Sequence, residues 1–97
     1  MYAGVVSVQL KVGKAQEATQ IYQDSVAPEL RQMRGFQAGY VLTNAETGKG
    51  YIIGLWDTQE DAQSFESSGA FREQAAKFED MLDEPASREV FEVSAQA

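Results

Sequence analysis

The chain has 97 residues, 43% of them hydrophobic, and a formal net charge of −7 from fifteen acidic and eight basic residues. This length supports one domain with one core, spanning residues 1–97. Nucleic-acid binding requires a basic stripe, whereas this acidic chain repels phosphates, so we expect no nucleic-acid partner. No apolar run reaches the roughly 18 residues of a membrane span, and the N-terminal stretch lacks a signal sequence. We therefore expect no membrane association and a cytoplasmic location.

Two chemically important residue types, cysteine and histidine, are absent from the chain. Their absence excludes thiolate nucleophiles, Ser-His-Asp triads, an imidazole base and His-ligated zinc or haem iron from this chain. The acidic residues fall mainly opposite the apolar stripes of the predicted helices, so we interpret them as solvated faces and expect no metal site. Any chemistry must use carboxylates, phenols, amides, backbone groups or the substrate itself.

The first half of the chain predicts a strand, a long helix and a second strand. Residues 3–12 alternate between apolar and polar, and the inward face is predicted to carry Val6, Val8, Leu10 and Val12. From residue 14 to residue 33, apolar residues recur at spacings of three and four, which is typical of one helical stripe. Pro28 removes a backbone donor inside this stripe, so we expect a kink or restart near Ala27. Residues 36–43 alternate again as a strand.

The second half predicts a hairpin partner, a helix in two parts and a last strand. The run "YIIGLW" at 51–56 completes a hairpin with the preceding strand. Thr58, followed three residues later by Asp61, is a capping-box signature, so a helix is expected to begin directly after it. "SSG" at 67–69 interrupts the helical stripe, which then resumes. Residues 87–95 alternate as a fourth strand.

The order strand, helix, strand, strand, helix, strand is typical of an α+β, ferredoxin-like βαββαβ protomer. This fold is a four-stranded antiparallel sheet with its helices on one face. The other face is left open, and we expect it to carry apolar residues such as Val5, Val41 and Ile52. An apolar sheet face needs a cover, which a second copy of the same sheet supplies. We therefore predict a homodimer through the open sheet face.

Aromatic residues concentrate on elements that should meet between the helices and the sheet. One interpretation is ordinary core packing, because ring-rich stripes at helical or strand period are usually core. The other is an aromatic-lined pocket for a planar ligand, with tyrosine hydroxyls and the indole N–H as its polar groups. The residues concerned include Tyr22, Tyr40, Trp56, Phe65 and Phe71. The pattern alone leaves both interpretations open.

Two stretches, "VAPELRQMRGFQAGYVLTNAETG" at 26–48 and "YIIGLWDTQEDAQSF" at 51–65, resemble the antibiotic biosynthesis monooxygenase superfamily of dimeric α+β barrels. They show the same succession of a helix end, a Gly-Phe pair opening a strand, a hairpin, a strand ending in Trp, and a capped helix. The resemblance implies a ferredoxin-like protomer, a dimer whose two sheets form a barrel, and a pocket between sheet and helices in each subunit.

The resemblance also implies a function, because enzymatic members of the family include cofactor-free oxygenases in which a deprotonated phenol or quinol itself supplies the electron to oxygen. We therefore predict a cofactor-independent monooxygenase or oxidase of a small planar aromatic or quinol, with no cofactor. The pocket wall is predicted at Trp56, and Phe65 and Phe71 are predicted to contact the apolar faces of the ligand. Tyr22 or Tyr40 is predicted as the polar contact. No residue is predicted to be catalytic.

The companions of Trp56 differ from the family patterns. The haem-degrading branch implies a second Trp and a His, but Phe65 and Ala75 occupy those positions, so haem degradation is rejected. The cofactor-free oxygenases imply an Asn four residues before the Trp and a Tyr six after it, and here these are Ile52 and Ala62. These differences favour an alternative, a non-catalytic small-ligand-binding or interaction dimer of the same fold. A pocket of roughly a few hundred cubic ångströms would favour the enzyme.

Overall fold

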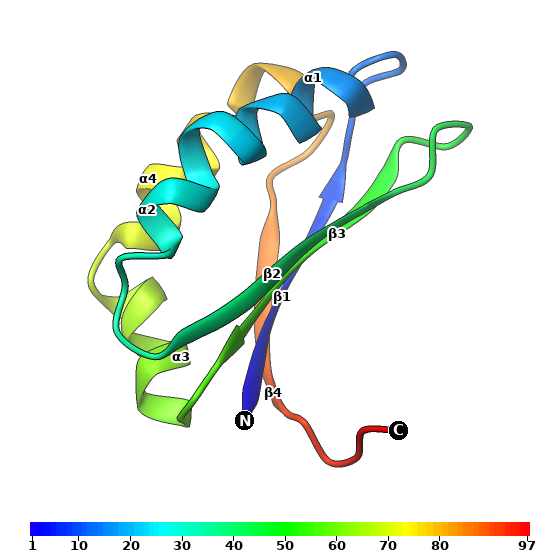
Figure 1. Cartoon of the computed structure of the whole chain (residues 1–97). Coiled ribbons are helices and arrows are strands. Elements are labelled where there is room, and N and C mark those ends of the chain that lie inside the picture. The colour runs from blue at the N-terminus through cyan, green and yellow to red at the C-terminus, as the bar shows by residue number, and fades with distance from the viewer.

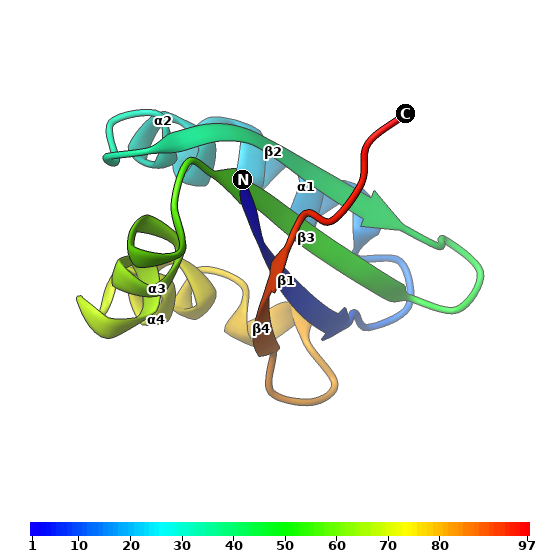
Figure 2. The ribbon, with the colours of Figure 1, turned by 90° about the horizontal axis from the view of Figure 1, so that it is seen from below.

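A four-stranded antiparallel sheet with helices on one face makes up the computed structural model, which describes all of residues 1–97. The strands are ordered β2-β3-β1-β4, and every neighbouring pair is antiparallel (Figure 2). Their bounds are β1 Tyr2–Gln9, β2 Phe36–Thr43, β3 Lys49–Trp56 and β4 Ser87–Glu92. Figure 1 shows the helices packed against one side of this sheet. The predicted ferredoxin-like βαββαβ fold is confirmed.

The first helical connection consists of three consecutive segments: α1 (Ala15–Ile21), the π-helical turn η1 (Tyr22–Val26) and α2 (Ala27–Leu30). The restart predicted near Ala27 is confirmed. Pro28 lies in the first turn of α2. Backbone N–H groups in a first turn have no partner within the helix, so the missing N–H of proline costs no hydrogen bond there. The π turn accommodates one extra residue per turn, and Tyr22 and Val26 at its two ends are both buried.

The second connection contains α3 (Gln59–Ser67), α4 (Ala70–Ala76) and the short 3₁₀ helix η2 (Glu79–Met81). The predicted cap of α3 is confirmed, because the Thr58 hydroxyl accepts a hydrogen bond from the Asp61 backbone N–H at 3.1 Å. The helix breaks after α3, and Gly69 precedes α4 with a left-handed φ of 90°. No helix of the chain has the length and hydropathy to cross a membrane.

The core lies between the inward face of the sheet and the helices. On β1, Val6 and Val8 are buried, and Leu10 follows them just beyond the strand end. The helices contribute Ala18, Val26, Leu30 and Ala62, and Phe78 and Met81 close the end beyond α4. Each large aliphatic or aromatic side chain buried in this way contributes roughly 1.5–3 kcal/mol. The predicted inward alternation on β1 therefore holds for Val6, Val8 and Leu10.

Three of the predicted side-chain placements are wrong. Val41 and Ile52 do not lie on the open face, because they stand in register with the buried Val6 and pack against the core. On β2 the cause is an irregularity between Phe36 and Ala38, which shifts the strand by one residue and reverses the alternation beyond it. Val12 is 90% exposed rather than inward, since β1 has already ended.

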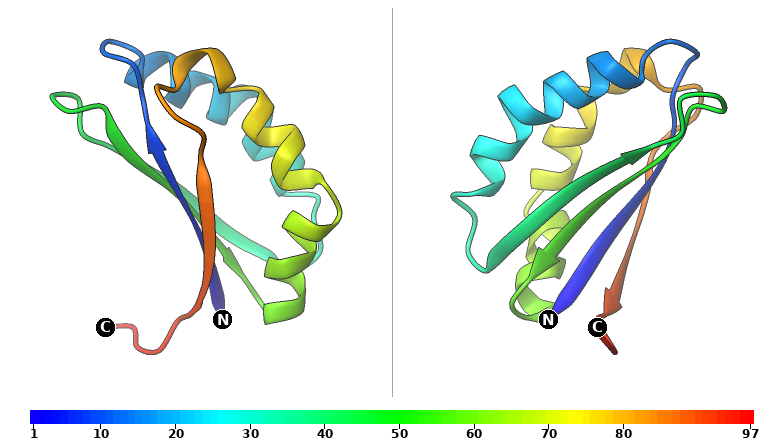
Figure 3. Two further views of the ribbon diagram at one scale, coloured as in Figure 1. Left: turned by 180° about the vertical axis from the view of Figure 1, so that it is seen from behind. Right: turned by 45° about the vertical axis from the view of Figure 1, so that its right-hand side comes forward.

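The open face of the sheet is apolar, as predicted. Figure 3 shows that no helix covers it in either view. Val5 lies on this face, paired with Ile53 on one side and Glu89 on the other. The large exposed hydrophobic residues of the strands are Tyr40, Leu42, Tyr51 and Phe91. A monomer therefore presents a broad aromatic and aliphatic surface to water.

Candidate functional site

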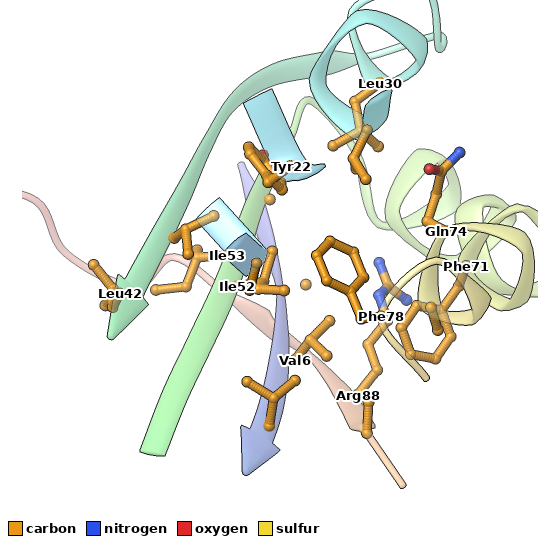
Figure 4. A pocket seen from close by; sticks show the side chains of 18 of the residues that line it. Val6, Tyr22, Leu30, Leu42, Ile52, Ile53, Phe71, Gln74, Phe78 and Arg88 are labelled. Atoms are coloured by element: carbon orange, nitrogen blue, oxygen red, sulfur yellow. The ribbon is translucent and has the colours of Figure 1, made fainter. Parts of the chain in front are cut away.

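A cavity of about 70 Å³ lies between the inward sheet face and the helices. Nineteen of its 24 lining residues are hydrophobic, so the cavity is an apolar space with few polar groups. Figure 4 shows side chains entering it from the strands, from the π-helical turn and α2, and from α4 and β4. The cavity exceeds the roughly 10–15 Å³ needed to hold one water molecule, so it has room for a few. It is neither a filled core nor the cavity of a few hundred cubic ångströms expected of an enzyme pocket.

Four of the five predicted ligand-contacting residues line this cavity: Tyr22, Trp56, Phe65 and Phe71. Tyr40 does not, because the shifted phase of β2 places it on the opposite face of the sheet, where it is 53% exposed. The expectation that Tyr40 converges on the same space as the other aromatic residues is therefore wrong.

The aromatic wall of the cavity is a chain of contacting rings that begins at β2 and ends at α4. Phe36 meets Trp56 edge-on at 5.3 Å between ring centroids, and Trp56 lies 5.4 Å from Phe65. Phe65 in turn lies 6.1 Å from Phe71. Such tilted and edge-on pairs are favourable arrangements of aromatic rings. Trp56 is buried at the centre of this chain, so it holds β3 against α3 whether or not a ligand binds.

Tyr22 lines the cavity from the π-helical turn and carries a phenolic hydroxyl. The hydroxyl lies directly above Gly39 of β2, where even a methyl side chain would collide with it. Burial raises the pKa of Tyr22, and the nearby positive charge of Arg31 offsets part of that effect. Tyr22 therefore stays neutral at physiological pH and can donate one hydrogen bond.

Arg88 of β4 is the one charged residue in the lining, and its side chain is 2% exposed. Its guanidinium donates to the Ala62 carbonyl at 2.9 Å and to the Glu66 carboxylate at 3.3 Å. It also lies 5.1 Å from the ring centroid of Phe65. Burial lowers the pKa of Arg88 while Glu66 raises it, and an arginine remains charged in either case. The guanidinium has five N–H groups, so these two bonds leave three for a ligand.

Gln74 of α4 brings an amide group that is only half paired. The residue is 5% exposed, and its Nε2 donates to the Glu29 carboxylate of α2. Its Oε1 is buried and has no hydrogen-bond partner. Lys77 also donates to Glu29, at 3.2 Å, and these two hydrogen bonds hold the pKa of Glu29 below its ordinary value. An unpaired buried acceptor costs roughly 1–3 kcal/mol, so Gln74 is unusual for a residue with only a packing role.

Sequence reasoning did not identify Arg88 and Gln74 as site residues. Gln74 carried a usable signal, because it is a polar residue in the phase of an apolar stripe. Gln74 lies three residues after Phe71 and four before Phe78, on the inward side of α4. Arg88 shares its strand face with Val90, which packs against the core, but also with Glu92, so the pattern of β4 did not mark Arg88 as inward. Polar residues at inward positions are informative because buried polar groups need partners.

Chemically, the cavity combines aromatic faces with three kinds of polar group. Arg88 can stabilise an anionic oxygen, Tyr22 can donate a hydrogen bond, and the Gln74 oxygen can accept one. Ile52 and Ala62 occupy the two positions that carry polar residues in the oxygenase pattern. Ile52 lines the cavity and Ala62 is fully buried, so these positions add no polar group to the site. No group of three or more His, Cys, Asp or Glu residues is placed to hold a metal ion.

Comparisons with known proteins agree with this description. The family model described as antibiotic biosynthesis monooxygenase matches residues 1–77. No match was found among curated proteins. Among solved structures, a monooxygenase from the gene ActVA-Orf6 of Streptomyces coelicolor, in complex with the ligand nanaomycin D, superposes with a TM-score of 0.82 at 11% identity. That match covers 99% of this chain and 89% of the other.

Two further solved structures show the same fold. SnoaB, a cofactor-independent oxygenase from Streptomyces nogalater, has a TM-score of 0.76 at 12% identity, over 98% of this chain and 94% of its own. MhuD, a haem degrader from Mycobacterium tuberculosis with two haems in its active site, has a TM-score of 0.78 at 16% identity, over 100% and 99% of the two chains. At these identities the likeness concerns the fold alone.

Proposed function

The chain belongs to the antibiotic biosynthesis monooxygenase family, and on that premise we propose that it is a cofactor-independent monooxygenase or oxidase of a small planar aromatic or quinol. The observation that carries the proposal is the buried Arg88 guanidinium in the wall of an otherwise aromatic cavity. A phenolate needs a positively charged donor, and the bonds of Arg88 to Ala62 and Glu66 leave N–H groups that can donate to it. Two of the solved structures of this fold are described as a monooxygenase and as a cofactor-independent oxygenase.

In the proposed reaction the substrate is the reductant. A phenol or quinol bound near Arg88 loses a proton more readily, because the guanidinium stabilises the resulting oxyanion. In the oxidase form, the quinol gives two electrons and two protons to O₂, which produces the quinone and hydrogen peroxide. In the monooxygenase form, a ring methylene loses two hydrogens and gains one oxygen atom as a carbonyl, and the second oxygen atom leaves as water. Neither form requires a metal or organic cofactor.

The substrate-contacting residues that we propose are Trp56, Phe65 and Phe71 for the ring faces and Tyr22 for a hydrogen bond. The present cavity of about 70 Å³ is smaller than the engineered cavity of about 150 Å³ that binds benzene. A ring can therefore enter only if part of the wall moves. Phe71 belongs to a part of the wall where such an opening could form, because Phe71, Ala75, Leu82 and Ala86 line both the cavity and a surface depression beside α4.

We also propose that the working form is a homodimer joined through the open sheet face. The exposed rings and aliphatic side chains of β2, β3 and β4 form an apolar surface that is exposed to water in a monomer, which is unfavourable. A twofold pairing of two such sheets covers both surfaces at once.

A second candidate is a non-catalytic dimer that binds a small ligand. Two observations favour it: the cavity is small, and apolar Ile52 and Ala62 replace the polar companions of the tryptophan in the oxygenase pattern. In this case the same residues bind the ligand, and no oxygen is consumed.

Oxygen uptake separates the two candidates. The purified protein is incubated with a panel of hydroquinones and polycyclic phenols under oxygen, with a no-protein control and a Trp56→Phe control. The enzyme proposal expects uptake with at least one substrate that exceeds both controls, together with the corresponding quinone or carbonyl product. Binding of a panel member without any uptake above the controls would establish the second candidate and exclude the first.

A further inference from the structure

The unpaired side-chain oxygen of Gln74 is the feature of the cavity that packing leaves unexplained. It belongs to a residue that is 5% exposed, it has no hydrogen-bond partner, and it lines the aromatic cavity. In Figure 4, Gln74 lies at the edge of the cavity near Leu30, with its oxygen and nitrogen pointing in different directions. Buried acceptors in folded proteins are nearly always satisfied, so this oxygen needs a donor from outside the chain.

The orientation of the Gln74 amide follows from its partner. Glu29 is ionised at neutral pH, because two donors, Gln74 and Lys77, hold its pKa low, and an ionised carboxylate can only accept hydrogen bonds. The amide nitrogen of Gln74 must therefore face Glu29, and the amide oxygen is left on the other side. Lys77 is itself held in place by the Ser25 carbonyl at 3.1 Å. This chain of contacts leaves Gln74, a residue of the cavity lining, with an acceptor oxygen that no donor of the protein reaches.

We propose that Gln74 determines specificity by accepting a hydrogen bond from a hydroxyl group of the bound ring, so that the cavity selects rings bearing a protonated hydroxyl over rings without one. The inference rests on the proposed function, since it concerns the ligand of the same cavity. A quinol carries such a donor, whereas a quinone carries only carbonyl oxygens, which repel the Gln74 oxygen. Gln74 thus favours binding of the reduced ring and release of the oxidised one.

Arg88 and Gln74 act on different oxygens of the ring under this proposal. Arg88 is a donor and stabilises an oxygen that has lost its proton, while Gln74 is an acceptor and needs an oxygen that keeps its proton. A ring that carries two hydroxyls can satisfy both groups as its monoanion. A ring with no hydroxyl satisfies neither.

Phenol and toluene test the proposal, because they have nearly the same shape and differ by a hydroxyl in place of a methyl group. Neither is readily oxidised, so binding is measured without turnover. Trp56 is the only tryptophan and lies in the cavity wall, so its indole N–H signal in ¹H–¹⁵N spectra reports binding. The quantity of interest is the ratio of the toluene Kd to the phenol Kd, compared among wild type, Gln74→Met and the exposed control Gln63→Met.

The proposal expects the ratio to fall at least about tenfold in Gln74→Met and to stay unchanged in Gln63→Met. Glu29→Gln, a substitution at an exposed side chain, should also lower the ratio, because a neutral amide partner lets the Gln74 amide flip. An unchanged ratio in Gln74→Met would overturn the proposal, whatever the ratio in Glu29→Gln.

Oxygen uptake measured on the same proteins keeps this inference separate from the proposed function. If the wild type binds phenol more tightly than toluene but consumes no oxygen with any quinol, only the proposed enzymatic activity is overturned. A wild type that consumes oxygen but shows the same ratio as Gln74→Met overturns only the role of Gln74.

Discussion

At the scale of single residues, Arg88 links the fold to the proposed chemistry. Its guanidinium holds β4 to α3 through the Ala62 carbonyl and the Glu66 carboxylate, and it also provides the positive charge of the cavity. Gly4 on the neighbouring strand leaves the space that this side chain occupies, since a Cβ there would collide with the guanidinium. A glycine and a buried cation on adjacent strands therefore form one structural unit.

Replacing Arg88 by methionine should lower kcat/KM for a quinol by about 100-fold, the effect of removing one oxyanion donor. The pH at which the rate rises should also move upward, because the substrate phenol no longer has a cation to lower its pKa. Steady-state oxygen uptake between roughly pH 6 and 10, where phenols titrate, measures both effects. The control is Arg72→Met on the exposed side of α4, and an unshifted pH profile in Arg88→Met would argue for a purely structural role.

Glu29 makes the free energy of unfolding depend on pH. Its hydrogen bonds with Gln74 and Lys77 lower its pKa in the folded state, so they stabilise the fold above the ordinary pKa of 4.5. That contribution is lost as the pH falls through the lower folded-state pKa.

Urea unfolding at pH 7 and pH 3 should therefore show wild type more stable than Glu29→Gln at pH 7, with the difference shrinking at pH 3. Glu17→Gln, which removes a carboxylate from an exposed pair with Lys14, is the control. An equal difference at both pH values would show that the carboxylate does not act through its charge.

At the scale of secondary-structure elements, α3 positions the cavity wall because it carries Phe65 and supplies the carbonyl that binds Arg88. The Thr58 cap fixes the start of this helix. Thr58→Ala should reduce the free energy of unfolding by about 1 kcal/mol, and Thr58→Ser should restore most of it. Urea denaturation followed by circular dichroism measures the change, and equal stability of Thr58→Ala and wild type would contradict the importance of the cap.

The sequence predicted every strand and both helical connections, because apolar periodicity, Pro28 and the Thr58 cap are local signals. It did not predict which face Tyr40 and Val41 occupy. The irregularity after Phe36 is a backbone feature that depends on the pairing of β2 with β3, and it reverses the alternation of all later residues in the strand. Strand alternation without knowledge of the bulge therefore placed Tyr40 in the wrong layer.

Only the aromatic residues of the candidate site were predicted from the sequence. Ring-rich stripes identified Tyr22, Trp56, Phe65 and Phe71, since their periodicity is visible in the sequence. Arg88 and Gln74 come from elements distant in sequence, and only the packed structure shows that both are buried and that one lacks a partner.

At the scale of the whole molecule, the sheet separates two functions. One face closes the cavity and the other is proposed to join two copies of the chain. Tyr40, at 53% exposure on the edge strand β2, lies on this second surface rather than at the cavity.

Tyr40→Glu should therefore convert a dimer into a monomer, because it places a charge within the apolar contact between the sheets. Val12→Glu is the matched control, since Val12 is 90% exposed but lies beyond the end of β1. Sedimentation equilibrium at micromolar concentration is the measurement. A wild-type mass equal to that of one chain would contradict the dimer.

We propose that the cavity between sheet and helices binds a planar, hydroxyl-bearing ring. A crystal structure of the protein grown without oxygen, with the tightest-binding quinol of the panel, tests it most directly. We expect the ring to lie against Trp56 and Phe65, with one hydroxyl within hydrogen-bond distance of the Gln74 oxygen. We also expect a cavity larger than the present volume of about 70 Å³. Quinol found only outside the cavity, with the ring contacts of Trp56 and Phe65 unchanged, would contradict it.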